Sequence, residues 1–286
     1  MNRARFLIAA LALACFGSAS PILPAEAAPA ARAFSPTRFS VTVTGSGPDV
    51  ILIPGLAASR DVWRGIVARV PGYRYHLVQV AGFAGAPAGG NAKGDVVAPL
   101  AEEVARYIAA RRLDRPALVG HSMGGTVAMM VAARHPARIG KVMVVEMLPQ
   151  PAGLLGSTAA SSRGLADTLR DLSSSPGGRR LVESVIGLFG NAADMSGRSD
   201  PDVVSRATHE LALIDLTAEL PRIAAPLSVV YASLDATRRA AADRAYAAAY
   251  SGKRGTRLVR IDDSGHMIMY DQPSAFAAAL RRFLAN

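Results

Sequence analysis

The sequence is poor in the residues on which several kinds of protein chemistry depend. Its only cysteine is Cys15, which lies in an apolar N-terminal segment, so the mature chain is expected to have no thiol. That absence excludes a disulfide, a thiolate nucleophile and a zinc–sulfur cluster. No histidine–carboxylate pair has metal-ligand spacing, and the glycine-rich stretch at 82–90 lacks the G-x-G-x-x-G pattern. We therefore expect neither a metal nor an organic cofactor.

Charged residues are also scarce, at 19% of the chain, and cations dominate them to give a formal net charge of +10. The basic residues are almost all arginine and are scattered, with no basic block that contains interleaved aromatic residues. Nucleic-acid binding relies on clustered cations and on aromatic side chains that stack on bases. The charge therefore indicates a compositional bias, and no nucleic-acid partner is expected.

The chain has 286 residues, and about half of them are apolar. This is enough to bury a full-sized core, which excludes a disordered tail and a collagen-like repeat. The length favours one large α/β domain with an inserted subdomain over two independent domains.

Residues 1–27 have the three-part pattern of a secretory signal peptide. Asn2 to Arg5 is positively charged, Phe6 to Phe16 is an unbroken apolar run, and small residues continue to Ala27. The apolar run is shorter than the roughly 20 residues that span a bilayer as a helix. We predict cleavage after Ala27, with a site after Ala19 as the alternative, and export to the periplasm or medium without stable membrane insertion.

From Phe39 onward, short β-branched runs alternate with longer helical patterns. This alternation predicts an α/β fold, a mostly parallel sheet flanked by helices. The runs that read as strands are 39–44, 50–53, 75–80, 117–119, 141–145, 227–231 and 257–261. The helical patterns are 95–112, 123–135, 164–172, 203–216, 238–250 and 274–284.

The alternation breaks between Met147 and Pro221, a stretch rich in Gly, Ser and Pro. We interpret residues 147–221 as an inserted helical cap, and residues 28–146 and 222–286 as the core. Because the cap follows a strand of the sheet, it is expected to fold over the edge at which that strand ends.

The strongest chemical signal is Gly120-His121-Ser122-Met123-Gly124, a match to G-x-S-x-G. The bare pattern arises easily by chance, but here a buried strand precedes it and a small-residue helix follows it. In that context the glycines allow a tight strand-to-helix turn that exposes Ser122 as a nucleophile. The helix N-terminus would also direct backbone donors toward developing negative charge.

A serine nucleophile needs a base, and the base needs an orienting acid. His266 follows the last predicted strand, at the sheet edge where it could reach Ser122. Asp235, after the preceding strand, gives the chain order Ser, Asp, His and is our preferred acid. Glu146, directly after the strand 141–145, is the alternative, and Asp271 is expected to cap the final helix.

Two backbone N–H groups are candidates for an oxyanion hole. One belongs to Met123, the residue after the nucleophile, and the other to Leu56 in the loop after the strand 50–53. Gly55 would let that loop approach closely. His121 adjoins the serine, but neighbouring side chains diverge at a sharp turn, so we expect it to have a packing role.

These residues resemble the α/β-hydrolase family, in particular its capped, esterase-like branch, over roughly Phe39 to Leu284. Residues 120–125 are similar to the family's nucleophile elbow, Asp235 to its acid position, and Gly265-His266 to its histidine loop. One departure is Pro54-Gly55, where the family commonly has His-Gly. The resemblance implies a serine hydrolase that cleaves carboxylic esters through a Ser-His-Asp triad and an acyl-enzyme.

Peptidase, lactonase and carbon–carbon bond hydrolase activities on the same triad remain alternatives, as does an exported binding protein without turnover. An aspartate-nucleophile member is disfavoured because Ser122 occupies the elbow. Apolar residues of the cap, including Leu181, Leu188 and Phe189, outnumber clustered charges. They favour a small-molecule ester with an uncharged acyl group of small to medium size.

Overall fold

A computed structural model of the chain describes residues 34–155 and 198–285. The chain divides into a short N-terminal unit, residues 1–33, and a large unit, residues 34–286, to which all described elements belong. The predicted signal peptide and its cleavage site lie outside the described residues. So do residues 156–197 of the predicted cap, which include Leu181, Leu188 and Phe189.

The large unit is built on a seven-stranded sheet with the strand order β1-β3-β2-β4-β5-β6-β7. Only the edge strand β1 is antiparallel to its neighbour, and the other described pairs are parallel. The strands are β1 (Phe39–Gly45), β2 (Asp49–Ile53), β3 (Arg74–Val80), β4 (Ala117–His121), β5 (Lys141–Val145), β6 (Leu227–Ser233) and β7 (Arg257–Asp262). The fold class and all seven strand ranges predicted from the sequence are confirmed, each end within two residues.

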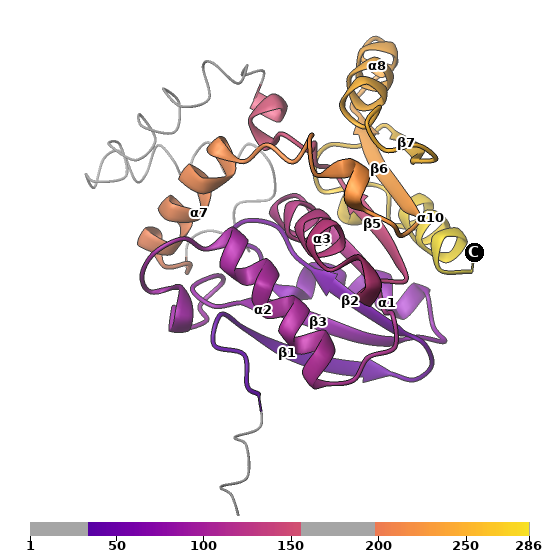
Figure 1. Ribbon diagram of the computed structural model, residues 1–286. Coiled ribbons are helices and arrows are strands. Elements are labelled where there is room, and N and C mark those ends of the chain that lie inside the picture. The colour runs from indigo at the N-terminus through magenta and orange to yellow at the C-terminus, as the bar shows by residue number, and fades with distance from the viewer. Residues whose placement is uncertain (1–33, 156–197, 286) are drawn as a thin grey trace, which may run out of the picture. The chain divides into compact units, whose positions relative to one another are not determined.

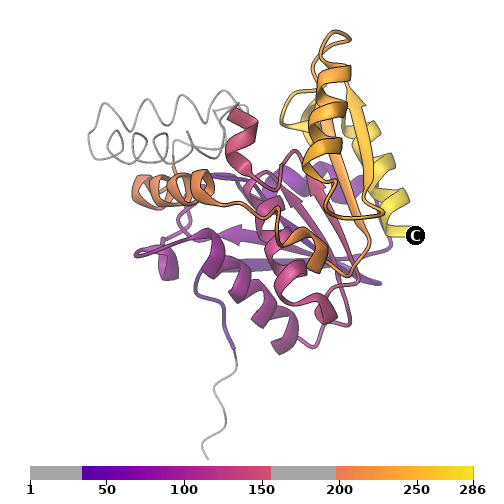
Figure 2. The same ribbon diagram turned by 45° about the horizontal axis from the view of Figure 1, so that its top comes forward.

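Helices cover both faces of this sheet (Figure 1). The described α-helices are α1 (Arg64–Arg69), α2 (Val97–Ala110), α3 (Met123–Arg134), α7 (Pro201–Leu213), α8 (Arg239–Ala249), α9 (Ile268–Asp271) and α10 (Pro273–Ala285). Helices α1, α9 and α10 pack on one face, and α2, α3 and α8 on the other. Figure 2 shows α2 and α3 side by side on their face.

The central strands divide their side chains between two hydrophobic cores. In β2, Ile51 and Ile53 face the core under α2 and α3, while Val50 and Leu52 face the core under α1 and α10. Successive strand residues point to opposite faces, so a strand that is buried on both sides has to be apolar at every position. This explains why the β2 run shows no polar alternation.

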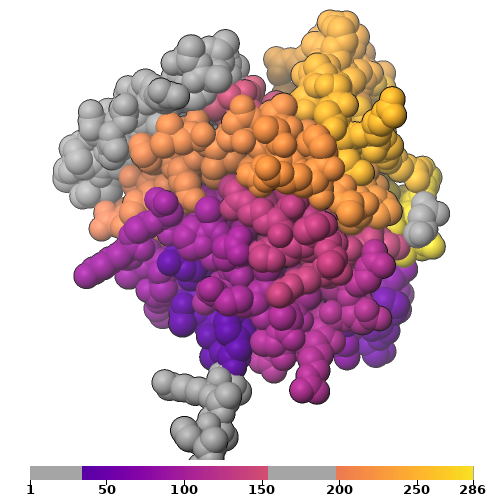
Figure 3. All heavy atoms as spheres, viewed as in Figure 1, coloured from indigo at the N-terminus to yellow at the C-terminus, as the bar shows by residue number. Residues whose placement is uncertain are grey.

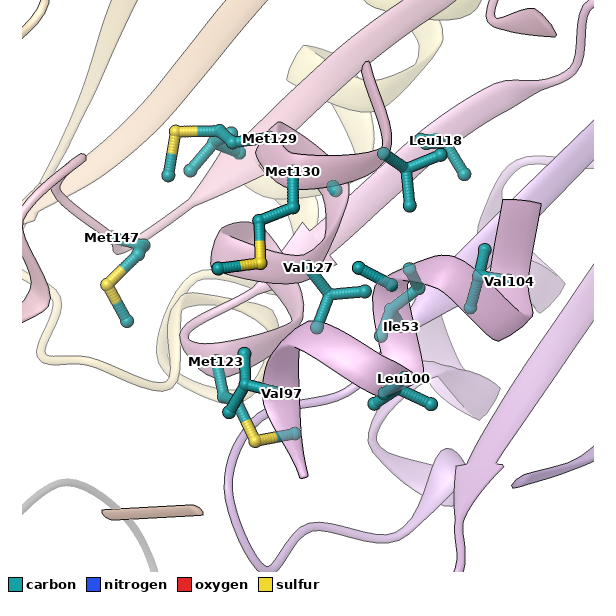
Figure 4. Packing of buried hydrophobic residues seen from close by; sticks show 14 of the residues in the cluster. Ile53, Val97, Leu100, Val104, Leu118, Met123, Val127, Met129, Met130 and Met147 are labelled. Atoms are coloured by element: carbon teal, nitrogen blue, oxygen red, sulfur yellow. The ribbon is translucent and has the colours of Figure 1, made fainter. Parts of the chain in front are cut away.

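The core under α2 and α3 is rich in methionine. Met123, Met129 and Met130 of α3 lie in one cluster with Met147 and with Leu100 of α2 (Figure 4). Methionine is flexible and fills irregular gaps. Every residue of α3 except its last is buried, so this helix is a fixed base for the turn that precedes it.

Helix α7, in the predicted cap, is joined to the core by a charged side chain. The carboxylate of Glu210 accepts hydrogen bonds from the N–H groups of Val96 and Val97, both at 2.7 Å, and of Ala98 at 2.8 Å. These N–H groups at the start of α2 have no intrahelical partner, and a carboxylate is favourable there. In Figure 3 the α7 region lies directly against the surface of the core.

No helix among residues 34–155 and 198–285 is both long enough and apolar enough to cross a membrane.

Candidate active site

The candidate nucleophile, Ser122, lies on the turn between β4 and α3. Its backbone has a φ of 54° and a ψ of −125°, a left-handed conformation that is strained for any residue with a side chain. The turn is held by two hydrogen bonds: Ser122 N–H donates to Val145 O at 2.8 Å, and Gly125 N–H donates to Ser122 O at 2.7 Å. A serine strained in this way at a strand-to-helix turn is typical of a hydrolase nucleophile.

Glycines make this turn possible because a side chain would not fit at them. A Cβ atom at Gly120 would lie 2.0 Å from the backbone oxygen of Gly124, and one at Gly124 would lie 2.2 Å from the backbone oxygen of Ile53. The glycines of the G-x-S-x-G motif therefore let α3 begin directly against β2 and β4.

Replacing Gly120 with alanine is expected to lower the free energy of unfolding by about 3 kcal/mol or more, since overpacking against fixed backbone cannot relax cheaply. Urea unfolding would measure the loss. Gly65→Ala is the matched control: Gly65 lies in α1, where a Cβ meets nothing within 4 Å, and alanine there should raise stability by up to about 1 kcal/mol. A Gly120→Ala protein as stable as the wild type would contradict the close packing of the turn.

The loop after β2 lies beside the nucleophile. A Cβ at Gly55 would lie 3.1 Å from the Cβ of Ser122, so the glycine allows the close approach that the sequence suggested. The loop turns where Ala58 N–H donates to Gly55 O at 3.2 Å. Among the hydrogen bonds of the described residues, none uses the N–H of Leu56 or Met123 as its donor. The two predicted oxyanion donors thus lie on the two segments that meet at Ser122.

Side chains from distant segments hold this loop in shape. Ala57 has a φ of 57°, and Ser199, just before α7, donates its hydroxyl to Ala57 O at 3.3 Å. Gln79 of β3 accepts from Arg60 N–H at 3.0 Å and donates to Ala58 O at 3.4 Å. These supports leave no signal in the sequence, because each connects residues far apart in the chain.

The candidate base, His266, lies in the loop between β7 and α9. Asp271, expected to cap the final helix, instead ends α9 and accepts from Gly265 N–H at 2.8 Å. The Ser264 hydroxyl lies 3.5 Å from the same carboxylate oxygen. The Asp271 carboxylate therefore fixes the loop immediately before His266.

Glu146, the alternative acid, directly follows β5 and is 9% exposed. Its Oε2 lies 3.4 Å from Nδ1 of His266. Its Oε1 accepts from Ala232 N–H at 2.5 Å and from the hydroxyl of Tyr246 at 3.3 Å. Burial, together with the Glu146 carboxylate, holds the pKa of Tyr246 well above its usual value, so the phenol stays protonated and donates. The carboxylate is thus aimed at His266 by two fixed donors.

Asp235, the preferred acid in the sequence analysis, has other partners. Its Oδ1 accepts from the N–H and the hydroxyl of Thr237, at 2.9 and 2.5 Å, and from the N–H of Arg238 at 3.1 Å. These hydrogen bonds, those from Thr237 first, keep the pKa of Asp235 below its usual value. The side chain is 47% exposed and closes the turn before α8. Among the contacts of the described residues, His266 meets Glu146, and the Asp235 carboxylate meets Thr237 and Arg238.

The hydrogen bonds of the described residues include none between Ser122 Oγ and His266. The two residues are connected instead through His121, whose Nε2 lies 2.9 Å from His266 O. The rings of His121 and His266 are 4.7 Å apart between centroids. Catalytic hydrogen bonds are often long before substrate binds. Only a packing role was predicted for His121, although its place at the end of a central strand, beside the candidate nucleophile, was a usable signal.

Within the described parts of the chain, no group of three or more His, Cys, Asp or Glu side chains is arranged to hold a metal ion. Beside the strained Ser122 turn, His121 contacts His266, and His266 in turn meets the carboxylate of Glu146. This set can perform nucleophilic and acid–base chemistry with the protein's own groups.

Residues 50–279 match the model of the Alpha/beta hydrolase family. The match covers most of the sequence, and the chain belongs to this family. The resemblance inferred from the elbow, the histidine loop and the strand pattern is thereby confirmed.

Two relatives are both named pimeloyl-[acyl-carrier protein] methyl ester esterase. The protein from Aeromonas hydrophila subsp. hydrophila is 38% identical over 111 residues, which are 38% of this chain and 42% of that protein. The protein from Vibrio vulnificus strain YJ016 is 26% identical over 208 residues, 67% of this chain and 77% of that protein. The alignment with the Aeromonas protein thus spans less than half of that protein's length.

Solved structures share the fold. An esterase from Exiguobacterium antarcticum superposes with a TM-score of 0.70 at 21% identity, covering 87% of this chain and 96% of that one. The enol-lactonase from Burkholderia xenovorans LB400 superposes with a TM-score of 0.67 at 19% identity, covering 87% and 97%.

Proposed function

We propose that the protein is a serine hydrolase that cleaves carboxylic esters, with Ser122 as nucleophile, His266 as general base and Glu146 as the acid that orients it. The observation that carries this proposal is the 3.4 Å approach of Glu146 Oε2 to His266 Nδ1, on a loop that His121 ties to the strained Ser122 turn. The methyl ester esterases among the relatives support an ester as the substrate class.

In the proposed reaction, Ser122 Oγ attacks the ester carbonyl carbon while His266 Nε2 takes the hydroxyl proton. The carbonyl electron pair moves onto oxygen, where the N–H groups of Leu56 and Met123 would stabilise the negative charge. The first turn of α3 adds the positive end of its dipole. The alcohol then leaves with the proton from His266, and water hydrolyses the acyl-enzyme by the same route.

Glu146 would make His266 a better base in two ways. Its Oε2 would accept a hydrogen bond from Nδ1–H of His266, which leaves Nε2 unprotonated and able to take the proton of Ser122. Its negative charge would also stabilise the imidazolium that forms as the serine attacks. The burial of Glu146 strengthens this second effect, because solvent screens the charge only weakly.

For the substrate, we propose an uncharged acyl group of small to medium size, supported by the apolar composition of residues 147–221. A panel of p-nitrophenyl esters of increasing acyl length should give its highest kcat/KM at short or medium length. Each methylene in an apolar pocket changes the binding free energy by roughly 1 to 3 kcal/mol, so the optimum should be sharp.

A lactone and an aminoacyl anilide belong in the same panel, since both can be cleaved by the same three residues. Ester cleavage faster than either supports the proposal. Faster cleavage of the lactone or the anilide would replace the proposed substrate class while leaving the nucleophile and base as they are. No turnover of any of the three classes by folded protein would contradict hydrolase function.

We also propose that the protein is exported. The support is the charged, apolar and small-residue pattern of residues 2–27. Protein purified from its native host should begin near Ala28 and carry no lipid, which N-terminal sequencing and intact-mass measurement would test. Retention of Met1 in the purified protein would overturn this proposal.

A further inference from the structure

One buried imidazole, that of His121, touches all three segments of the proposed active site. It is the last residue of β4, immediately before Ser122, and is 1% exposed. Its Nε2 lies 2.9 Å from the backbone oxygen of His266. A carbonyl oxygen can only accept a hydrogen bond, so Nε2 must carry the proton of the neutral ring. This contact fixes the tautomer of His121.

The other edge of the ring faces the loop after β2. Nδ1 of His121 is buried and has no hydrogen-bond partner among the described residues, and a Cβ at Gly55 would lie 3.1 Å from it. The same Cβ would lie 3.1 Å from the Cβ of Ser122. A buried acceptor without a partner is unfavourable, and an apolar side chain at this position would avoid that cost. The hydrogen bond that Nε2 makes to His266 O therefore explains why residue 121 is polar.

We infer that His121 is a positioning residue of the proposed hydrolase. By donating from Nε2 to His266 O, it fixes the backbone of the general base, so that the His266 ring stays aimed at Glu146 on one side and at Ser122 on the other. The inference rests on the proposed role of His266 as the base. His121 precedes the proposed nucleophile in the chain. Its contact with the proposed base, His266, cannot be predicted from the order of residues in the sequence.

The charge state of His121 suits this role. Burial, and secondarily the nearby His266, lower the pKa of His121 to about 3, so the ring is neutral at the pH values at which a histidine base works. A cation at His121 would oppose the positive charge that His266 gains when it takes the serine proton, since the two ring centroids are 4.7 Å apart. A neutral donor avoids that repulsion.

Three substitutions separate the hydrogen bond from the volume of the ring. In His121→Gln the side-chain amide nitrogen can occupy the place of Nε2 and donate to His266 O. In His121→Asn the shorter amide reaches only the place of Nδ1, and in His121→Leu there is no donor. Misplacing a reacting group by about 1 Å can cost about 100-fold in rate, so we expect the Asn and Leu variants to lose about 100-fold in kcat with little change in KM. The Gln variant should retain at least about one fifth of kcat.

Thermal unfolding of each variant identifies any that does not fold. Wild-type kcat in a folded Leu variant, or a Gln variant that is folded and as slow as Leu, would overturn the inference. Ser122→Ala and His266→Ala measured beside them separate the two hypotheses. If both abolish turnover while His121→Leu does not, only the positioning role fails; if either keeps full turnover, the proposed function fails.

A second measurement, on the wild-type protein, does not depend on the folding of any His121 variant. Nitrogen-15 NMR of histidine-labelled protein should show one ring that is neutral from pH 5 to 8, with its proton on Nε2. Variants at the other histidines assign that signal. A His121 ring that titrates in this range, or that carries its proton on Nδ1, would overturn the inference whatever the kinetics show.

Discussion

Ser122→Ala is expected to lower kcat for ester hydrolysis by about 10⁴-fold or more, the loss typical of removing a triad nucleophile. The hydroxyl is the only group removed, and Ser122 makes its two turn-closing hydrogen bonds through its backbone. The fold should therefore be kept. Initial rates on the best ester of the panel, with the thermal midpoint of each protein, would measure both effects.

A covalent label tests the same residue without relying on rate. A serine-directed phosphonate should add its mass to the wild-type peptide that contains Ser122 and should not label the Ser122→Ala protein. Ser251→Ala is the matched control: Ser251 is exposed after α8 and its hydroxyl donates to Ala248 O, so turnover should be unchanged. Full activity in Ser122→Ala would show that another group is the nucleophile.

The sheet could be predicted from the sequence because its central strands are buried on both faces. Val50 to Ile53 and Val142 to Val145 are short apolar runs, and the structure shows them within β2 and β5. Burial on two faces leaves a strong local signal that needs no knowledge of distant contacts. The short helices α1 and α9 leave no such periodic signal and were not predicted.

The elbow was predictable for a related reason. The turn at Ser122 needs only a short pattern of residues, in which glycines occupy the positions where α3 meets β2 and β4 and a serine stands between them. The loop after β2 was predictable only in part. Gly55 indicated that this loop approaches Ser122 closely. The contacts of Ser199 and Gln79 with the loop arise from tertiary packing, and no spacing of residues in the sequence predicts them.

The choice between the two acids could not be made from the order of strands alone. β5 and β6 are parallel neighbours, so the carboxylates that follow them reach the same edge of the sheet. Their local contacts distinguish them: Thr237 and Arg238 donate to the carboxylate of Asp235, whereas Oε2 of Glu146 lies 3.4 Å from His266 Nδ1. An aspartate side chain commonly accepts a hydrogen bond from the backbone two residues on, as Asp235 does from Thr237 N–H, and this tendency could have favoured a structural role.

Replacing each acid in turn is therefore expected to give very different results. In Glu146→Gln the shape is kept, but the charge that would stabilise the His266 imidazolium is lost, and kcat should fall by roughly 10³- to 10⁴-fold. In Asp235→Asn the side-chain oxygen can still accept from Thr237 and Arg238. The kcat of Asp235→Asn should fall by less than about 3-fold, because Asp235 would affect the rate only by stabilising the turn before α8.

Both variants should be measured on one ester at saturating concentration, with thermal unfolding to show that each is folded. The side-chain oxygen of glutamine at 146 can keep the hydrogen bond from Ala232, so a loss of rate without a loss of fold is the informative result. The contrast is decisive because the two substitutions remove the same charge from carboxylates that follow adjacent strands. If Asp235→Asn is the slower enzyme, the orienting acid is Asp235, and the approach of Glu146 to His266 is not the catalytic arrangement.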